Sequence, residues 1–270
     1  MADLLNSHKV YENFILEDKI EDILKTAVDL QSYMTTDNTL ALEPGMKKVV
    51  HTYKATGNVE DLNMGEGNSE QIGVTFDSAE YDVKVTQGKF QYYDEQEMTD
   101  PMVVDTGLDG LAKTMVNDFI TKAIAEYGKA TLTETGSAWS FDIVADAIAK
   151  MNTEDESGLF LLISPEDKAG FRKALKDDLS YSEGYVRTGY IGTVCGVPVI
   201  VSKAVPAKTA FLATREAVTL FIKKGSEIEQ QRNADIRSNE IYARKVAVVA
   251  LTDATKVVKI TIGTTVTPNP

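Results

Sequence analysis

Residues 106–128 read TGLDGLAKTMVNDFITKAIAEYG and carry the strongest helical pattern in the chain. Their apolar residues recur about every 3.6 positions, which predicts one amphipathic helix; they are Leu108, Leu111, Met115, Phe119, Ala123 and Tyr127. Thr106 and Asp109 have the spacing of a capping box, and Gly128 is a C-terminal stop signal. At 1.5 Å per residue the helix is on the order of 33 Å long. The sequence therefore predicts a rod that can span a small domain.

The segment before this rod has the periodicity of strands. Between residues 46 and 97 apolar residues alternate with polar ones, which predicts β-structure; they include Val49, Tyr53, Val74, Phe76, Tyr81, Val83 and Val85. The intervening residues 56–68 are polar and glycine-rich, and they are too many for a tight turn, so they predict the tip of a protruding hairpin. Because an isolated hairpin is at best marginally stable in water, we expect this one to need a partner.

A second amphipathic helix is predicted near the N-terminus. Apolar residues recur at helical spacing from Leu16 to Met34 and include Ile20 and Leu24, with acidic residues between them. This helix stands alone before the loop Glu43-Pro44-Gly45, so its apolar face must rest on a distant part of the chain or on another copy.

A compact α/β part is predicted after the rod. Ser140 is the expected N-cap of a helix over 141–151, and the apolar run 158–163 has the length of a buried strand. Ser164-Pro165 starts a further helix, which we expect to turn Phe171, Ala174 and Leu175 inward.

The last part of the chain is predicted to hold several short strands. Strands are expected at 197–201 and 210–213, before a polar stretch at 225–239. Two late strands follow at 241–250 and 257–262. The loose alternation of the first predicts burial on both faces, and the clean alternation of the second predicts burial on one.

The sequence offers little for catalysis, cofactors or metals. His8 and His51 are the only histidines and Cys195 is the only cysteine, which nearly excludes a histidine metal site and fully excludes an internal disulfide. No phosphate-binding glycine loop is present. The acidic clusters 94–97 and 154–156 are read as solvated loop charge. We therefore predict a protein that is not an enzyme and binds neither cofactor nor metal.

The charge balance disfavours a protein that grips nucleic acid. Lys plus Arg total 28 against 41 Asp plus Glu, for a net charge of -13, and no basic stretch could neutralise a phosphate backbone. No run approaches the roughly 18 apolar residues of a membrane span, and the first residues lack the pattern of a signal peptide. We expect a protein made and used in a cytoplasm, without a membrane partner.

Charges of alternating sign fill the stretch from Glu227 to Glu240. Mixed charge of this kind is typical either of a plain surface or of specific pairing between subunits, and the sequence leaves both open. The candidates for pairing are Glu229, Arg232 and Arg237.

The order of these elements resembles the major capsid proteins of tailed bacteriophages, which have the α+β Hong Kong 97-like fold. The most specific local match is Gly192-Thr193-Val194-Cys195-Gly196-Val197-Pro198-Val199, which looks like the Gly-x-x-x-Gly-x-Pro-Val stretch common in these subunits. The polar stretch with Arg232-Asn233-Ala234-Asp235 and the closing Ala243-Arg244-Lys245-Val246-Ala247 are similar to the usual ending of the family. The resemblance covers essentially the whole chain.

The resemblance implies a division of the chain into four parts. Residues 1–43 would be the N-terminal arm, and 44–98 the extended β-hairpin loop. Residues 99–136 and 225–270 would form the peninsular domain with its long spine helix. Residues 137–224 would form the axial α/β domain.

The function implied is self-assembly. Copies of the chain would join into hexamers and pentamers and then into the icosahedral shell of a virion, assembled in the cytoplasm of a bacterial host. The shell would enclose double-stranded DNA and contact it only non-specifically. The chain lacks a coiled-coil segment that could act as a built-in scaffold, which implies a separate scaffolding protein, and a portal is the other expected partner. The residues expected between subunits are Leu16, Ile20, Leu24, Tyr53, the loop tip from Asn58 to Asn68, Glu229, Arg232 and Arg237.

Three other interpretations remain open. An encapsulin-type compartment shell shares this fold and would hold cargo enzymes in place of DNA. An α/β enzyme would need a convergent polar cleft, for which the scarcity of histidine gives little material. A tail-tube or baseplate subunit fits poorly with two well-capped helices and a rod helix.

Overall fold

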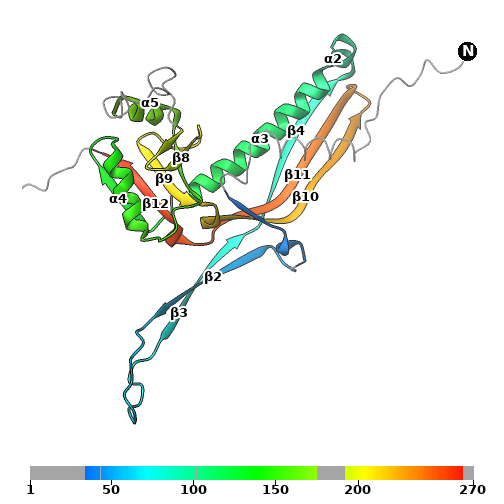
Figure 1. The fold of residues 1–270 in the computed structure, drawn as a ribbon. Helices are drawn as coiled ribbons and strands as arrows, with labels where there is room; N and C mark the ends of the chain where they lie inside the picture. The colour runs from blue at the N-terminus through cyan, green and yellow to red at the C-terminus, as the bar shows by residue number, and fades with distance from the viewer. Residues whose placement is uncertain (1–33, 43, 101, 175–191, 264–270) are drawn as a thin grey trace, which may run out of the picture.

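A computed structural model describes residues 34–42, 44–100, 102–174 and 192–263. Figure 1 shows two β-sheets, a long helix that runs from one to the other, and a two-stranded hairpin that projects far from both. The mixed helix and strand content agrees with the predicted α+β class.

The long helix α3 (Met102–Tyr127) is the predicted rod, and it begins four residues earlier than expected. Asp100 accepts a hydrogen bond from the Met102 backbone N–H (2.9 Å). The predicted capping box at Thr106 and Asp109 is therefore wrong, because both residues lie inside the helix. The predicted end is confirmed: the Gly128 N–H donates to the Ile124 carbonyl (2.9 Å).

One side of α3 packs on a four-stranded sheet. Its strands are β1 (Thr35–Asp37), β10 (Val218–Asn233), β11 (Ser238–Leu251) and β4 (Lys84–Tyr93), in the order β1-β10-β11-β4. The apolar face of β11 lies in the same buried cluster as Leu108 and Met115 of the helix. A short helix, α2 (Asp94–Thr99), joins β4 to α3.

The C-terminal half of α3 belongs to a core shared with the second sheet. Tyr127 packs edge-on against Phe160, with ring centroids 6.3 Å apart, and also contacts Phe211. The helix therefore buries a wider stripe than the one predicted, with Ala112, Val116, Ile120 and Ile124 added to it. A helix that contacts two sheets must be apolar over more of its circumference.

The second sheet has six strands in the order β5-β12-β9-β6-β8-β7. They are β5 (Leu132–Gly136), β12 (Val257–Ile262), β9 (Thr209–Thr214), β6 (Leu159–Ile163), β8 (Val197–Val201) and β7 (Thr193–Val194). Helices α4 (Phe141–Met151) and α5 (Pro165–Ala174) pack into one core with this sheet, and the end of α3 packs into another. The predicted cap is confirmed, since Ser140 Oγ accepts from the Ile143 N–H (3.3 Å).

Three sequence expectations in these sheets are wrong. Ala174 is exposed instead of turned inward, whereas Phe171 is buried as expected; Leu175 lies outside the described residues. β12, expected to be buried on one face, lies inside the six-stranded sheet with residues in both cores. β11, in contrast, packs on both faces as expected, with Val249 in the core beneath α3 and Ala250 in a second buried cluster. The stretch 225–239, expected only as polar chain, forms most of one 16-residue strand, β10, and its turn into β11.

The projecting hairpin consists of β2 (Lys47–Thr56) and β3 (Gly73–Asp82), paired antiparallel with Tyr53 opposite Phe76. These strands confirm the predicted alternation. The next strand, β4, lies within the segment expected as the loop hairpin, but it pairs with β11 of the four-stranded sheet. Ahead of the hairpin, β1 and η2 (Thr39–Leu42) form a strap that the sequence did not predict. Two further short turns are η3 (Arg215–Ala217) and η4 (Ala254–Lys256).

Candidate assembly surfaces

The hairpin is anchored at its root by a small apolar cluster. Its buried members are Leu40 of the strap, Val50, Val83, Phe221 and Ala250. The ammonium group of Lys48 lies 5.0 Å from the centre of the Phe221 ring, and Lys223 Nζ donates to the Leu40 carbonyl (3.3 Å). The strap, the hairpin and strands β10 and β11 therefore all contribute to the root, and these contacts hold the hairpin in its projecting position.

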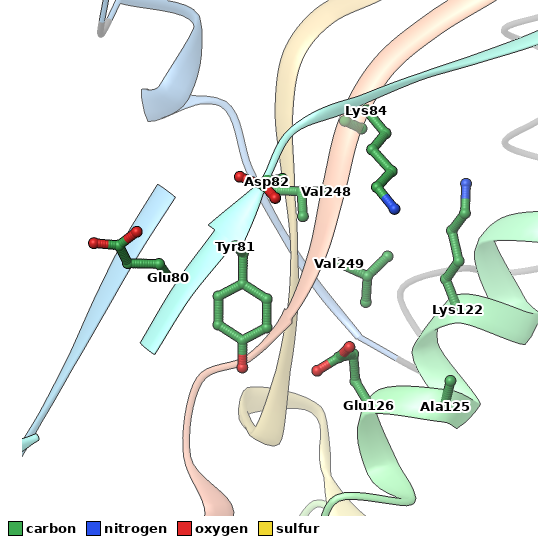
Figure 2. Close-up of a pocket in the computed structure, with 10 residues that line it drawn as sticks. Glu80, Tyr81, Asp82, Lys84, Lys122, Ala125, Glu126, Val248 and Val249 are labelled. Carbon is green, nitrogen blue, oxygen red and sulfur yellow. The ribbon is translucent and has the colours of Figure 1, made fainter. Parts of the chain in front are cut away.

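A groove of about 290 Å³ lies between this root and α3 (Figure 2). Tyr81 of β3 donates to the Leu251 carbonyl (3.4 Å), and Lys129 lies over its ring at 5.5 Å. Lys129 also pairs with Glu126 (2.6 Å). Burial, and then the charge of Glu126, raise the pKa of Tyr81, so the phenol stays protonated. These contacts tie the hairpin root to the helix.

The lining of this groove carries both negative and positive charges. It includes the carboxylates of Glu80, Asp82 and Glu126 and the ammonium groups of Lys84 and Lys122. Figure 2 shows Lys84, Lys122 and Glu126 around Val249, whereas the side chain of Glu80 points away from Val248 and Val249. Histidine, serine and cysteine are absent from the lining, so the groove holds neither a Ser–His nor a Cys–His pair.

The rest of the described chain provides no better chemical site. A second hollow, of about 520 Å³, is lined by polar loop residues that include Asp155, Arg215 and Lys256. No three His, Cys, Asp or Glu side chains in the described ranges gather as a metal site. Cys195 is half-buried with its Sγ 3.6 Å from the Phe141 carbonyl, and burial raises the pKa of its thiol, which disfavours the reactive thiolate.

The shaft of the hairpin exposes large apolar side chains. Tyr53 is 68% exposed, and Phe76 and Val74 are 72% and 64% exposed. Tyr53 was predicted from the sequence as an interface residue. Phe76 and Val74 were recognised only as strand residues, although their alternation with Tyr53 in the paired strand was the signal that could have identified them.

The hairpin tip is acidic and carries further exposed apolar residues. Its carboxylates are Glu60, Asp61, Glu66 and Glu70, with no Lys or Arg between residues 57 and 72. Val59 and Met64 are almost fully exposed, and Asn58 and Asn68 are also exposed. Glu60 accepts hydrogen bonds from the Ser69 N–H and hydroxyl (2.9 and 2.5 Å), which also lower its pKa. The tip therefore has internal structure while its side chains face solvent.

The three charged residues expected between subunits have partners within the chain. Arg232 pairs with Asp94 (2.9 Å), which also accepts from Asn239 (2.8 Å). Asp94 is buried, so the expectation that residues 94–97 are all solvated is wrong. Arg237 lies 3.8 Å from Glu95.

Glu229 belongs to a ladder of ion pairs on the open face of the four-stranded sheet. Arg244 of β11 binds both Glu229 (3.2 Å) and Glu227 (2.7 Å) of β10. Hydrogen bonds from Lys224 and Arg244 lower the pKa of Glu227. This cross-strand pairing explains how so polar a stretch forms a strand. Leu16, Ile20 and Leu24, the arm residues predicted at an interface, lie outside the described residues.

Comparison with known proteins identifies relatives of this chain. A family model described as "Phage capsid protein" matches residues 77–260. The chain is 25% identical over 257 residues to the major capsid protein of Staphylococcus phage phiMR11, covering 92% of each chain.

Solved structures share the fold at low sequence identity. The mature capsid subunit of bacteriophage PhiM1 superposes with a TM-score of 0.66 at 12% identity, covering 99% of this chain and 92% of that one. The virus-like particle from Pyrococcus furiosus gives a TM-score of 0.63 at 11% identity, covering 92% and 98%. Within the described residues, no helix is long and apolar enough to cross a membrane.

Proposed function

The chain belongs to the phage capsid protein family and is a phage major capsid protein, and we propose that it closes its shell mainly through the projecting hairpin. One observation carries this proposal: a ribbon of two ten-residue strands stands clear of the body with its aromatic residues in solvent (Figure 1). A two-stranded ribbon is marginally stable alone. Its large exposed apolar side chains are typical of an interaction surface.

We keep the four parts expected from the sequence but change their bounds, because β5 and β12, expected in the peninsular domain, pair within the six-stranded sheet, and β10 joins the four-stranded sheet from Val218 onward. We assign α3 as the spine helix and the four-stranded sheet with it as the peninsular domain. The six-stranded sheet with α4 and α5 is the axial domain, and residues 1–43 are the N-terminal arm. The extended loop is the β2–β3 hairpin, and β4 joins the peninsular sheet.

In this mechanism each subunit makes several weak contacts with its neighbours, and the same contacts repeat around a closed, symmetric shell. Hexamers and pentamers of this chain form the icosahedral shell, with Tyr53, the tip from Asn58 to Asn68 and the arm residues Leu16, Ile20 and Leu24 between subunits. Glu229 and Arg237 are well exposed and available to a neighbour, whereas Arg232 mainly holds the buried Asp94. The chain catalyses nothing in this role.

The wider partners are proposed from the family role. A separate scaffolding protein and a portal assist assembly in the cytoplasm of the bacterial host. The acidic subunit, with a net charge of -13, contacts packaged DNA only non-specifically.

Deletion of residues 58–68 tests the role of the hairpin tip. These residues lie beyond the paired strands, which end at Thr56 and Gly73, so a short turn can replace them without touching either sheet. We expect a folded subunit, with the unfolding transition of the parent chain, that forms no closed shells. Shells of normal size and number in electron micrographs of the deletion variant would refute this role.

A protein compartment is the second candidate function, because the fold is also that of a virus-like particle from Pyrococcus furiosus. Purified particles distinguish the two roles. Particles isolated from the native host that contain double-stranded DNA support the phage capsid, and particles that contain protein cargo without DNA support the compartment.

A further inference from the structure

We propose that one face of the hairpin shaft, formed by Val49, Tyr53, Val74 and Phe76, is the surface that docks on a second copy of this chain, while the opposite face stays in solvent. This inference rests on the proposed function and adds to it the side of the hairpin on which the neighbour lies. We call the four residues the apolar shaft face.

Strand register places these four residues on the same side. Successive residues of a strand point to opposite faces, and directly paired residues share a face. Tyr53 pairs with Phe76, and two positions away Ala55 pairs with Val74; Val49 lies four positions from Tyr53 on the same strand. The two aromatic side chains are therefore direct cross-strand neighbours. The other face carries Thr52, Lys54, Thr75 and Asp77, all of them exposed.

The root of the hairpin decides which face is free. Val50 and Tyr81 belong to the same face as Thr52 and Lys54, and at the root this face already packs on the chain's own body. Val50 is 7% exposed within the root cluster, and Tyr81 is bonded to Leu251 beside α3. The apolar shaft face is directed away from that contact. The subunit's own body therefore lies on the other side of the ribbon.

The distribution of apolar side chains on the shaft does not suit a hairpin that is surrounded only by water. A ribbon that only extended into water would have both faces polar. Here the face that continues from the buried root is polar, whereas the face turned away from the body exposes an aromatic pair and two valines among the polar residues His51, Ser78 and Glu80. An aromatic pair exposed at 68% and 72% stabilises the ribbon fully only when a partner covers it. A second copy is the partner that a self-assembling subunit supplies at every position of a shell.

A pair of double variants tests the assignment on the full-length chain. Tyr53→Ser with Phe76→Ser removes the aromatic pair from the apolar shaft face, and Lys54→Ser with Thr75→Ser alters the neighbouring paired positions on the opposite face. All four residues are exposed, so we expect the thermal unfolding of Trp139, the only tryptophan, to be unchanged in both. Shell yield is measured by sedimentation and electron microscopy.

We expect the Tyr53/Phe76 variant to lose closed shells and the Lys54/Thr75 variant to keep them. Tyr53→Phe, which retains the ring, should also assemble. In shells of the parent chain, hydroxyl-radical labelling of Tyr53 and Phe76 should fall several-fold relative to free subunits.

Three outcomes overturn the inference. The first is that the Tyr53/Phe76 variant forms normal shells. The second is that both double variants lose shells equally. The third is that the labelling of both aromatic residues is undiminished in shells. If the tip deletion abolishes shells while the Tyr53/Phe76 variant assembles normally, the face assignment fails and the proposed function stands. If the parent chain forms no shells under any condition, both fail together.

Discussion

Replacement of Asp167 by Asn should weaken the six-stranded sheet and the helices packed on it more than any exposed charge change. The buried Asp167 carboxylate accepts hydrogen bonds from Trp139 Nε1 (3.0 Å), Ser164 Oγ (2.7 Å) and the Lys208 N–H (3.0 Å). It thereby ties α5, the strand-to-helix loop that holds Trp139 and the turn before β9 into one unit.

The expected magnitude follows from these donors. In Asp167→Asn one oxygen becomes an NH₂ donor, and Ser164 can reverse its hydroxyl to accept from it. The loss of stability then comes from the hydrogen bonds donated by Trp139 and Lys208, which become bonds to a neutral group or are lost. Hydrogen bonds to a charged group contribute roughly 1.5–3 kcal/mol each. We expect a loss of about 2–3 kcal/mol in the free energy of unfolding. For a chain of this size that lowers the Tm by roughly 4–12 °C.

The assay uses the emission of Trp139, which contacts Asp167 directly and packs on Phe171 with ring centroids 4.7 Å apart. Thermal unfolding of soluble subunits is followed for the parent chain, Asp167→Asn and the matched control Glu166→Gln. Glu166 is the exposed neighbour in the same helical turn, so its replacement should shift the Tm only slightly. An equal, small shift in Tm for both variants would refute the view that the Asp167 carboxylate holds α5, the Trp139 loop and the turn before β9 together.

Two further predictions concern α3 and the charged ladder. Gly107→Ala should lower the Tm because the added methyl would overlap the ring of Phe90, whereas Gly110→Ala, with open space around it, should raise stability by roughly 0.5–1 kcal/mol; equal shifts in calorimetry would contradict this contrast. Because Lys224 and Arg244 lower the folded-state pKa of Glu227, its ion pairs stabilise the fold above the usual glutamate pKa of about 4.3 and lose that effect as the pH falls through the lower folded value. The difference in urea midpoint between the parent chain and Glu227→Gln should therefore shrink from pH 6 to pH 3, and a constant difference would count against the pairing.

Elements with a strong internal pattern could be predicted from the sequence. The cap at Ser140, the fully buried β6 and the end of α3 at Gly128 depend on neighbours within a few residues, so local chemistry defines them. The start of α3 was misplaced because Asp100, which caps it, lies before Pro101 and outside the apolar stripe. The strand β10 was missed because it is rich in charge, and its Glu227 and Glu229 are neutralised only where Arg244 of the paired strand β11 lies beside them.

The candidate surfaces divide in the same way. Tyr53 and the loop tip were identified because a long polar hairpin with too little apolar material predicts a need for a partner. The buried role of Asp94 could not be read from its acidic neighbourhood, because Arg232 and Asn239 reach it across more than a hundred residues.

By itself, the sequence determined the periodic elements, their order, and the excess of acid that disfavours nucleic-acid binding. Only the tertiary structure decided that β4 leaves the hairpin for β11, that α3 is shared by two sheets, and which face of the hairpin shaft is free. The physical reason is that the periodicity of apolar residues indicates which face of a helix or strand is buried. Which other element buries that face depends on contacts between residues far apart in the chain.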